Sequence, residues 1–105
     1  MLPSKIKTLV NKLIDGTEHH DKKWEYQDDE AQVILYDEKI DVAISYKFDV
    51  HKEVGTFNVR LHQKSNSKDY YFSTDQDESD YARVSHLYDV AQSSDLDLDL
   101  DLDLD

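Results

Sequence analysis

The side chains best suited to metal chemistry are two adjacent histidines and the aspartate that follows them, His19-His20-Asp21. Imidazole and carboxylate groups are common protein ligands of zinc and related divalent ions. A metal site needs such groups to converge on one point, whereas neighbouring side chains in an irregular segment point apart. We therefore interpret these residues as part of a polar connection and predict no metal site there.

An acidic segment, 75–80 (Asp-Gln-Asp-Glu-Ser-Asp), has the alternating carboxylates of a calcium-binding loop. Such a loop requires glycine at its sixth position and glutamate at its twelfth. Here the sixth position is Asp80 and the twelfth is His86. The segment is therefore predicted to be the acidic start of a helix, where carboxylates complement the helix dipole.

Glycine and cysteine usage excludes several kinds of catalytic site. Glycine occurs only at Gly16 and Gly55, and cysteine is absent. Phosphate-binding loops and the G-x-S-x-G nucleophile elbow need several glycines in one segment. Thiolate nucleophiles, disulfides and Cys-ligated zinc need cysteine. The scattered Ser and His residues have no spacing that indicates a catalytic triad, so we predict no catalytic residue and no cofactor.

The chain is strongly acidic, with a net charge of −12 from 24 acidic and 12 basic residues. The tail 95–105 alternates Asp and Leu and holds six of the acidic residues, which leaves 18 acidic residues in 1–94. This sign repels phosphate backbones and anionic membranes, and it attracts basic proteins. We predict a basic protein partner or self-association, with no direct contact to nucleic acid or membrane.

Apolar segments are too short for a membrane span, because the longest unbroken run is 33–36. Lysines interrupt the N-terminal apolar stretch, which does not resemble a secretory signal. We expect a cytoplasmic protein.

Two amphipathic helices are predicted, one at each end of the folding part. The first ends near Gly16, which suits the left-handed residue that closes many helices. The second runs from about Asp77 to Gln92. Their apolar stripes are Ile6, Leu9, Val10, Leu13 and Ile14 in the first, and Tyr81, Val84, Leu87, Tyr88 and Ala91 in the second.

Between the helices the sequence alternates with the period of two that is typical of strands. The predicted strands are 24–26, 31–36, 40–50, 55–63 and 69–74. Short connections favour a meander, and the apolar face of the sheet must be covered. We predict an α+β domain over 1–94, with an N-terminal helix, about five antiparallel strands and a C-terminal helix. Both helices lie on one face of the sheet in this prediction.

The register between the strands 40–50 and 55–63 follows from parity. Apolar residues are even-numbered in the first strand and odd-numbered in the second, so paired numbers must sum to an odd value. We predict a sum of 105 with a four-residue loop, 51–54. The predicted pairs are Phe48 with Phe57, Tyr46 with Val59, Ile44 with Leu61, and Asp41 with Lys64.

Five residues are candidates for a protein-binding surface. Tyr36, Tyr70 and Tyr71 lie on strands with apolar residues on both faces, so we expect some of these rings to be exposed. Arg60 and His62, together with Ser45, are predicted on the uncovered face of the sheet. Tyrosine is enriched in interfaces, but ordinary core and edge packing is the favoured interpretation of the tyrosines. A solvated sheet face explains Arg60 and His62 equally well.

Two short segments resemble small uncharacterised α+β proteins of bacteria and phages. These are Leu13-Ile14, Thr17 and Trp24-Glu25 in the opening part, and 87–91 (Leu-Tyr-Asp-Val-Ala) in the last helix. The resemblance implies a bacterial or mobile-element setting. It implies no activity and no functional residue.

Three functional hypotheses remain. The first is a non-enzymatic acidic protein-binding module, such as an inhibitor, an immunity-type protein or an accessory protein, which could also mimic the charge of nucleic acid. The second is a structural domain that associates with itself through a sheet edge or through its tail. The tail is either a disordered acidic extension or an added edge strand. The third is a small metal- or ligand-dependent enzyme that uses His19, His20 or the face with Arg60 and His62.

Overall fold

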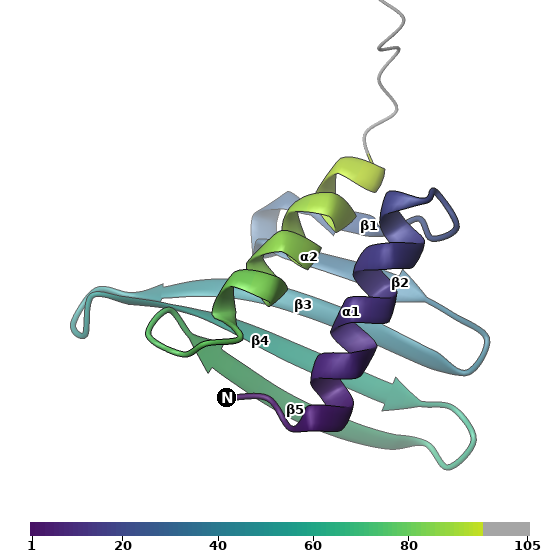
Figure 1. Cartoon of the computed structure of the whole chain (residues 1–105), viewed down its shortest axis with the longest axis horizontal. Helices are drawn as coiled ribbons and strands as arrows, with labels where there is room; N and C mark the ends of the chain where they lie inside the picture. The colour runs from purple at the N-terminus through teal and green to yellow at the C-terminus, as the bar shows by residue number, and fades with distance from the viewer. Residues whose placement is uncertain (96–105) are drawn as a thin grey trace, which may run out of the picture.

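Two helices cover one face of a five-stranded antiparallel sheet (Figure 1). The computed structural model describes residues 1–95, so the expectations for the rest of the Asp-Leu tail, 96–105, lie outside the described residues. The strands are neighbours in chain order, which confirms the predicted meander and the α+β class. The elements are α1 (Ser4–Glu18), β1 (Glu25–Gln27), the short 3₁₀ helix η1 (Asp28–Glu30), β2 (Gln32–Tyr36), β3 (Ile40–Asp49), β4 (Val54–Gln63), β5 (Lys68–Asp75) and α2 (Tyr81–Ser94).

The first helix runs past Gly16, which was predicted to end it. It continues to Glu18, and the left-handed residue after it is His20, with a φ of 65°. Gly16 serves close packing instead, because a Cβ there would lie 3.2 Å from Cγ of Lys22. The prediction of a closing glycine was wrong because His20 takes the left-handed conformation itself, and the N–H groups of His20 and Asp21 close the helix by donating to the carbonyls of Thr17 and Gly16, at 3.1 and 2.8 Å.

The second helix begins at Tyr81, later than the predicted Asp77, and continues to Ser94. The acidic segment ahead of it is held by contacts other than the helix dipole. Oε1 of Glu78 accepts a hydrogen bond from the backbone N–H of Asp75 at 3.0 Å, which turns this carboxylate back towards the preceding strand. A side chain used in this way cannot also cap the helix.

The register between β3 and β4 differs from the prediction by two residues. Paired numbers sum to 103, so Tyr46 lies opposite Phe57 and the four-residue loop is 50–53. This sum is odd, as predicted, so the even-numbered residues of β3 and the odd-numbered residues of β4 still share the face that the helices cover. The predicted pairs of Phe48 with Phe57, Tyr46 with Val59, Ile44 with Leu61 and Asp41 with Lys64 are wrong.

Two local features explain this register. Oδ1 of Asp49 accepts hydrogen bonds from the backbone N–H groups of His51 and Lys52, at 2.9 and 3.2 Å, so the turn begins directly after Asp49. Both bonds hold the pKa of the Asp49 carboxyl below its ordinary value, and the bond from Lys52 contributes most. In addition, Gly55 gives the ring of Tyr46 space, because a Cβ there would lie 2.5 Å from the Tyr46 hydroxyl oxygen.

The end of the β3–β4 hairpin extends beyond the helices (Figure 1). Phe48 and Val50, which were expected to face the core, are 49% and 71% exposed. The alternation of apolar residues therefore continues past the part of the sheet that the helices cover.

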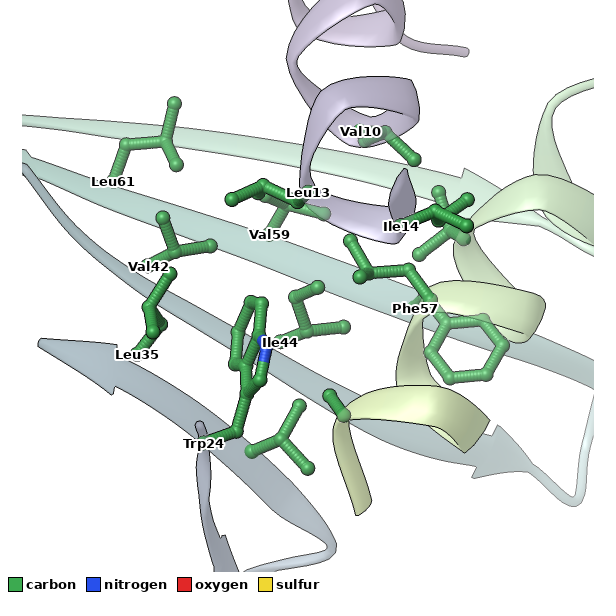
Figure 2. Close-up of a cluster of buried hydrophobic side chains, with 14 of the residues drawn as sticks. Val10, Leu13, Ile14, Trp24, Leu35, Val42, Ile44, Phe57, Val59 and Leu61 are labelled. Carbon is green, nitrogen blue, oxygen red and sulfur yellow. The ribbon is translucent and has the colours of Figure 1, made fainter. Parts of the chain in front are cut away.

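The core is organised around Trp24, which is 1% exposed and stands beside Leu35 and Ile44 on the sheet (Figure 2). Its indole N–H donates to Oγ1 of Thr17 at 2.9 Å, and that hydroxyl donates to the carbonyl of Leu13 at 2.7 Å. A buried indole needs such an acceptor, because an unpaired buried N–H destabilises the fold. This contact fixes the end of α1 against the start of the sheet.

A buried carboxylate joins the other end of the structure. Asp80 is 5% exposed, and it accepts hydrogen bonds from the hydroxyl of Thr74 and from the backbone N–H of Leu2, the latter at 2.6 Å. Burial by itself raises the pKa of Asp80, but the hydrogen bonds from Thr74 and Leu2 outweigh it and lower the pKa below the ordinary value. The N-terminal segment, β5 and the start of α2 are thereby held together.

The Thr17 contact can be tested by substitution. Thr17→Val keeps the shape of the side chain but leaves the indole N–H of Trp24 buried without an acceptor. We expect the free energy of unfolding to fall by about 1–3 kcal/mol, measured by urea denaturation. Thr8→Val is the matched control, because Thr8 makes the same bond to the carbonyl four residues earlier but is exposed. Equal losses in the two variants would contradict the role given to Thr17.

The Asp80 contact predicts a dependence of stability on pH. Because the pKa of Asp80 is lower in the folded state, its contribution is complete above the ordinary carboxyl value of 3.8 and is lost as the pH falls through the folded value. Asp80→Asn should lower the free energy of unfolding by about 1.5–3 kcal/mol at neutral pH. The gap to the wild type should narrow below about pH 4. Asp77→Asn, at an exposed position in the same turn, should show neither effect.

Candidate functional site

The face of the sheet that the helices leave uncovered is the candidate site, and we call it the open face. It is formed by the alternate residues that point away from the helices, and directly paired residues share a face. Its three central rows across the sheet are Tyr36, Asp41, His62 and Asp69; Ile34, Ala43, Arg60 and Tyr71; and Gln32, Ser45, Asn58 and Ser73.

Arg60 lies in the middle row of the open face, directly opposite Tyr71 on β5. In the same row Ile34 and Ala43 are only 8% and 5% exposed, although both α1 and α2 lie on the other side of the sheet. The longer side chains around them therefore provide the cover. The result is a small apolar floor with polar and aromatic walls, a form common in binding surfaces.

His62 lies between two carboxylates, opposite Asp41 on β3 and Asp69 on β5. Its Nδ1 is 2.7 Å from Oδ1 of Asp69, and both side chains are about half exposed. The Nζ of Lys64 is 3.3 Å from Oδ1 of Asp41, so these two residues approach each other even though they are not paired in the sheet. The exposed contact between His62 and Asp69 contributes little to stability, but it fixes the orientation of the imidazole.

The three candidate tyrosines are divided between the two faces. Tyr36 and Tyr71 are on the open face, 65% and 70% exposed. Tyr70 pairs with Leu61, which places it on the face that the helices cover, where it is 39% exposed. The structure therefore brings four of the five candidates, Tyr36, Arg60, His62 and Tyr71, to one surface and separates Tyr70 from them.

Two shallow cavities lie on the open face, on either side of Arg60. The larger has a volume of about 350 Å³ and is bounded by Ser45, Asn58 and Tyr71. The smaller, of about 240 Å³, includes Tyr36 and His62. Both also include Arg60 and Ala43, so together they form one interrupted depression across the centre of the sheet.

The strands place more negative than positive charge on this face. Its carboxylates outnumber its Lys and Arg residues by five to two. The carboxylates are Glu25, Asp41, Asp49, Asp69 and Asp75, and the cations are Lys47 and Arg60. The cations are in the interior of the sheet, so the open face presents a negative surface with Arg60 near its centre.

The two histidines in the connection between α1 and β1 are not part of this surface. His19 and His20 are exposed, and Nδ1 of His19 is 2.7 Å from the main-chain oxygen of Asp15. This oxygen, and then the Asp15 carboxylate, raise the pKa of His19. Within residues 1–95 no group of three or more His, Cys, Asp or Glu residues is placed to hold a metal ion.

Some residues of the depression were not among the sequence-based candidates. Gln32 and Ser73 belong to it because of the pairing of β2 with β3 and of β4 with β5. The register of these outer strand pairs has no parity signal in the sequence, because β2 and β5 carry apolar residues on both faces. Only the assembled sheet identifies them.

Comparisons with known proteins leave the family open. No family model matches the chain, and no match was found among curated proteins or solved structures. The resemblance to small bacterial and phage proteins therefore stays a prediction. Among the described residues, no helix is long and apolar enough to cross a membrane.

Proposed function

We propose that this chain is a non-enzymatic protein-binding module, and that its open face binds a basic protein surface. The observation that carries the proposal is the position of Tyr36 and Tyr71, two largely exposed aromatic rings, at the border of the depression around Arg60. Exposed Tyr and Arg side chains on a rigid sheet are the residue types that most often dominate binding energy.

The rigidity of the surface supports this proposal. The open face is built from strands whose other side is the hydrophobic core, so its backbone is held by the burial of Val42, Ile44 and Val59. Side chains on such a support lose less freedom on binding than side chains on a loop. A partner would therefore meet a preorganised surface.

The charge of the surface supports a basic partner. The five carboxylates lie towards the strand ends and on the outer strands of the face, and the chain as a whole carries −12. A negative surface of this kind accelerates encounter with a positive partner and makes the association sensitive to salt. Partners of this class include nucleic-acid-binding proteins, whose basic surfaces an acidic module can occupy.

The binding proposal can be tested with the two exposed tyrosines of the open face, Tyr36 and Tyr71. The double variant Tyr36→Ser/Tyr71→Ser should bind a partner about 100-fold more weakly than the wild type, because both rings are removed from the contact. Tyr70→Ser is the matched control, since Tyr70 is next to Tyr71 in the chain but lies on the other face. Urea denaturation should show that all three proteins fold.

The partner would be recovered on the immobilised full chain, identified, purified and then titrated against each variant by calorimetry. The proposal requires that the double variant loses binding, that Tyr70→Ser keeps it, and that affinity falls as NaCl rises to about 0.5 M. A purified partner that binds the wild type and the double variant equally well would refute it. So would a partner whose affinity does not change with salt.

Self-association through β5 is the second candidate, and the free edge of this strand favours it. The carbonyl of Ser73 accepts a hydrogen bond from the N-terminal ammonium group, and the N–H of Asp75 donates one to the side chain of Glu78. The backbone groups of these two residues therefore point away from β4. In an antiparallel pair this direction alternates, so Asp69 and Tyr71 also point outward. Among the described residues nothing bonds to their backbone groups.

These free groups define one register for a second copy of the chain. If Asp69 of each copy pairs with Tyr71 of the other, four backbone hydrogen bonds form and the carbonyl of Ser73 keeps its present donor. The two sheets would then join into one. The acidic charge of each chain opposes this contact, which is why we place it second.

The edge contact can be tested by removing one N–H. Tyr71→Pro lacks the outward N–H but leaves the bonds between β4 and β5 in place, and proline is tolerated on edge strands in this orientation. Tyr71→Ser loses the same ring and keeps the N–H. In sedimentation experiments self-association should persist in Tyr71→Ser and vanish in Tyr71→Pro.

Hydrogen exchange gives a second readout on the unmodified chain, where the amides of Asp69 and Tyr71 should become protected as concentration rises. A wild-type protein that stays monomeric at all concentrations would exclude this candidate.

A further inference from the structure

The larger cavity of the open face differs in charge from the rest of the molecule. None of the residues that line it is acidic, although acidic residues outnumber basic ones two to one in the whole chain. The two carboxylates nearest to Arg60 in the sheet, Asp41 and Asp69, line the smaller cavity on its other side. The larger cavity is thus a local region of positive charge within a negative surface.

The charge of this cavity comes from Arg60, whose guanidinium group is not engaged elsewhere. In the part of the chain that the structure describes, it makes no hydrogen bond and no ion pair. The second arginine of the chain, Arg83, is held by Oδ1 of Asn11 through Nε and Nη2, at 3.0 and 2.9 Å. Arg60 is exposed, so its five N–H donors are available to a ligand.

Neutral hydrogen-bonding side chains surround this guanidinium. Ser45, Asn58 and Ser73 form one row of the sheet, and all three line the cavity with Arg60. Across residues 1–95 their hydroxyl and amide groups have no hydrogen-bonding partner. The ring of Tyr71 forms a wall beside Arg60, because the two residues are directly paired.

From this arrangement we infer that the cavity is a binding site for a monoanionic carboxylate. The planar guanidinium of Arg60 offers two parallel N–H groups, which match the two oxygens of a carboxylate. The hydroxyls of Ser45 and Ser73 and the amide of Asn58 supply further donors, and Tyr71 covers an apolar or aromatic body next to the carboxylate.

The surrounding charge selects a monoanion over a phosphate dianion. A single arginine supplies one positive charge, and the carboxylates of the open face stand outside the cavity on several sides. A dianion would experience about twice the repulsion from them, and it would keep an uncompensated charge after pairing with Arg60. Phosphate is therefore the expected poor ligand.

The inference can be tested with acetate and benzoate as probes on the full chain labelled with ¹⁵N. Titration at constant ionic strength should shift the Arg60 side-chain Nε–H signal and the amides of Ser45, Asn58 and Ser73 until they saturate. Benzoate should bind more tightly than acetate because its ring can lie against Tyr71, and inorganic phosphate should bind more weakly than both.

Two variants of Arg60 separate charge from geometry. Arg60→Gln should abolish saturation, and Arg60→Lys should weaken the affinity at least about tenfold, since a point charge does not form the paired bonds. Arg83→Gln, which removes the other arginine, should leave the titration unchanged. The site does not exist if the shifts rise linearly with probe concentration, if Arg60→Gln leaves them unaltered, or if phosphate matches benzoate.

The carboxylate can belong to a small molecule or to the end of a polypeptide, and a further arm distinguishes them. A short peptide that ends in phenylalanine with a free carboxylate is compared with its C-terminal amide. Tighter binding of the free acid than of benzoate indicates a polypeptide end, and equal binding indicates a small carboxylate. Equal binding of the acid and the amide would overturn the inference. Because these probes are not basic proteins, this result is independent of the test of Tyr36 and Tyr71.

Discussion

The architecture depends on the burial of Trp24 with its N–H satisfied. The indole stands on the sheet between Leu35 and Ile44, and it can stay there only because Thr17 at the end of α1 accepts its hydrogen bond. The backbone N–H of Trp24 in turn donates to Oγ of Ser94 at the end of α2, at 3.0 Å. One residue thus connects the sheet to both helices, and it requires them to share one face.

The opposite face of the sheet is open as a direct consequence. With both helices on the Trp24 side, nothing in residues 1–95 covers the other side except its own side chains. The two edge strands differ in whether their outward backbone groups are hydrogen-bonded. The N–H of Tyr26 in β1 donates to Oδ2 of Asp95 at 2.9 Å, so β1 is closed by the end of α2. β5 keeps free backbone groups within residues 1–95, and the open face and the β5 edge are the two surfaces that we propose for recognition.

The half-buried tyrosines on the helix side show the contrast between the two faces. Tyr88 packs against the core beside Tyr26, and burial raises the pKa of its hydroxyl to about 12. Phe57 contacts Tyr46, Tyr81 and Tyr88, with ring centroids 5.0–5.3 Å apart. These rings pack at the border of the core, whereas Tyr36 and Tyr71 have no aromatic neighbour of this kind among residues 1–95 and are largely exposed. The same residue type therefore has a structural role on one side and a proposed binding role on the other.

The sequence by itself determined the element order, the antiparallel meander and which residues of β3 and β4 face the core, because the period of two and the helical stripes follow from burial alone. It also placed Arg60, His62 and Ser45 on one face. Only the tertiary structure decided the register, which the Asp49 turn and the space at Gly55 set, and the helix ends, which the left-handed His20 and the folded-back Glu78 set. The period of two already places Tyr70 and Tyr71 on opposite faces, but only the tertiary structure decided that Tyr71 is the one on the open face, because strands with apolar residues on both faces carry no sign of which side the helices will cover.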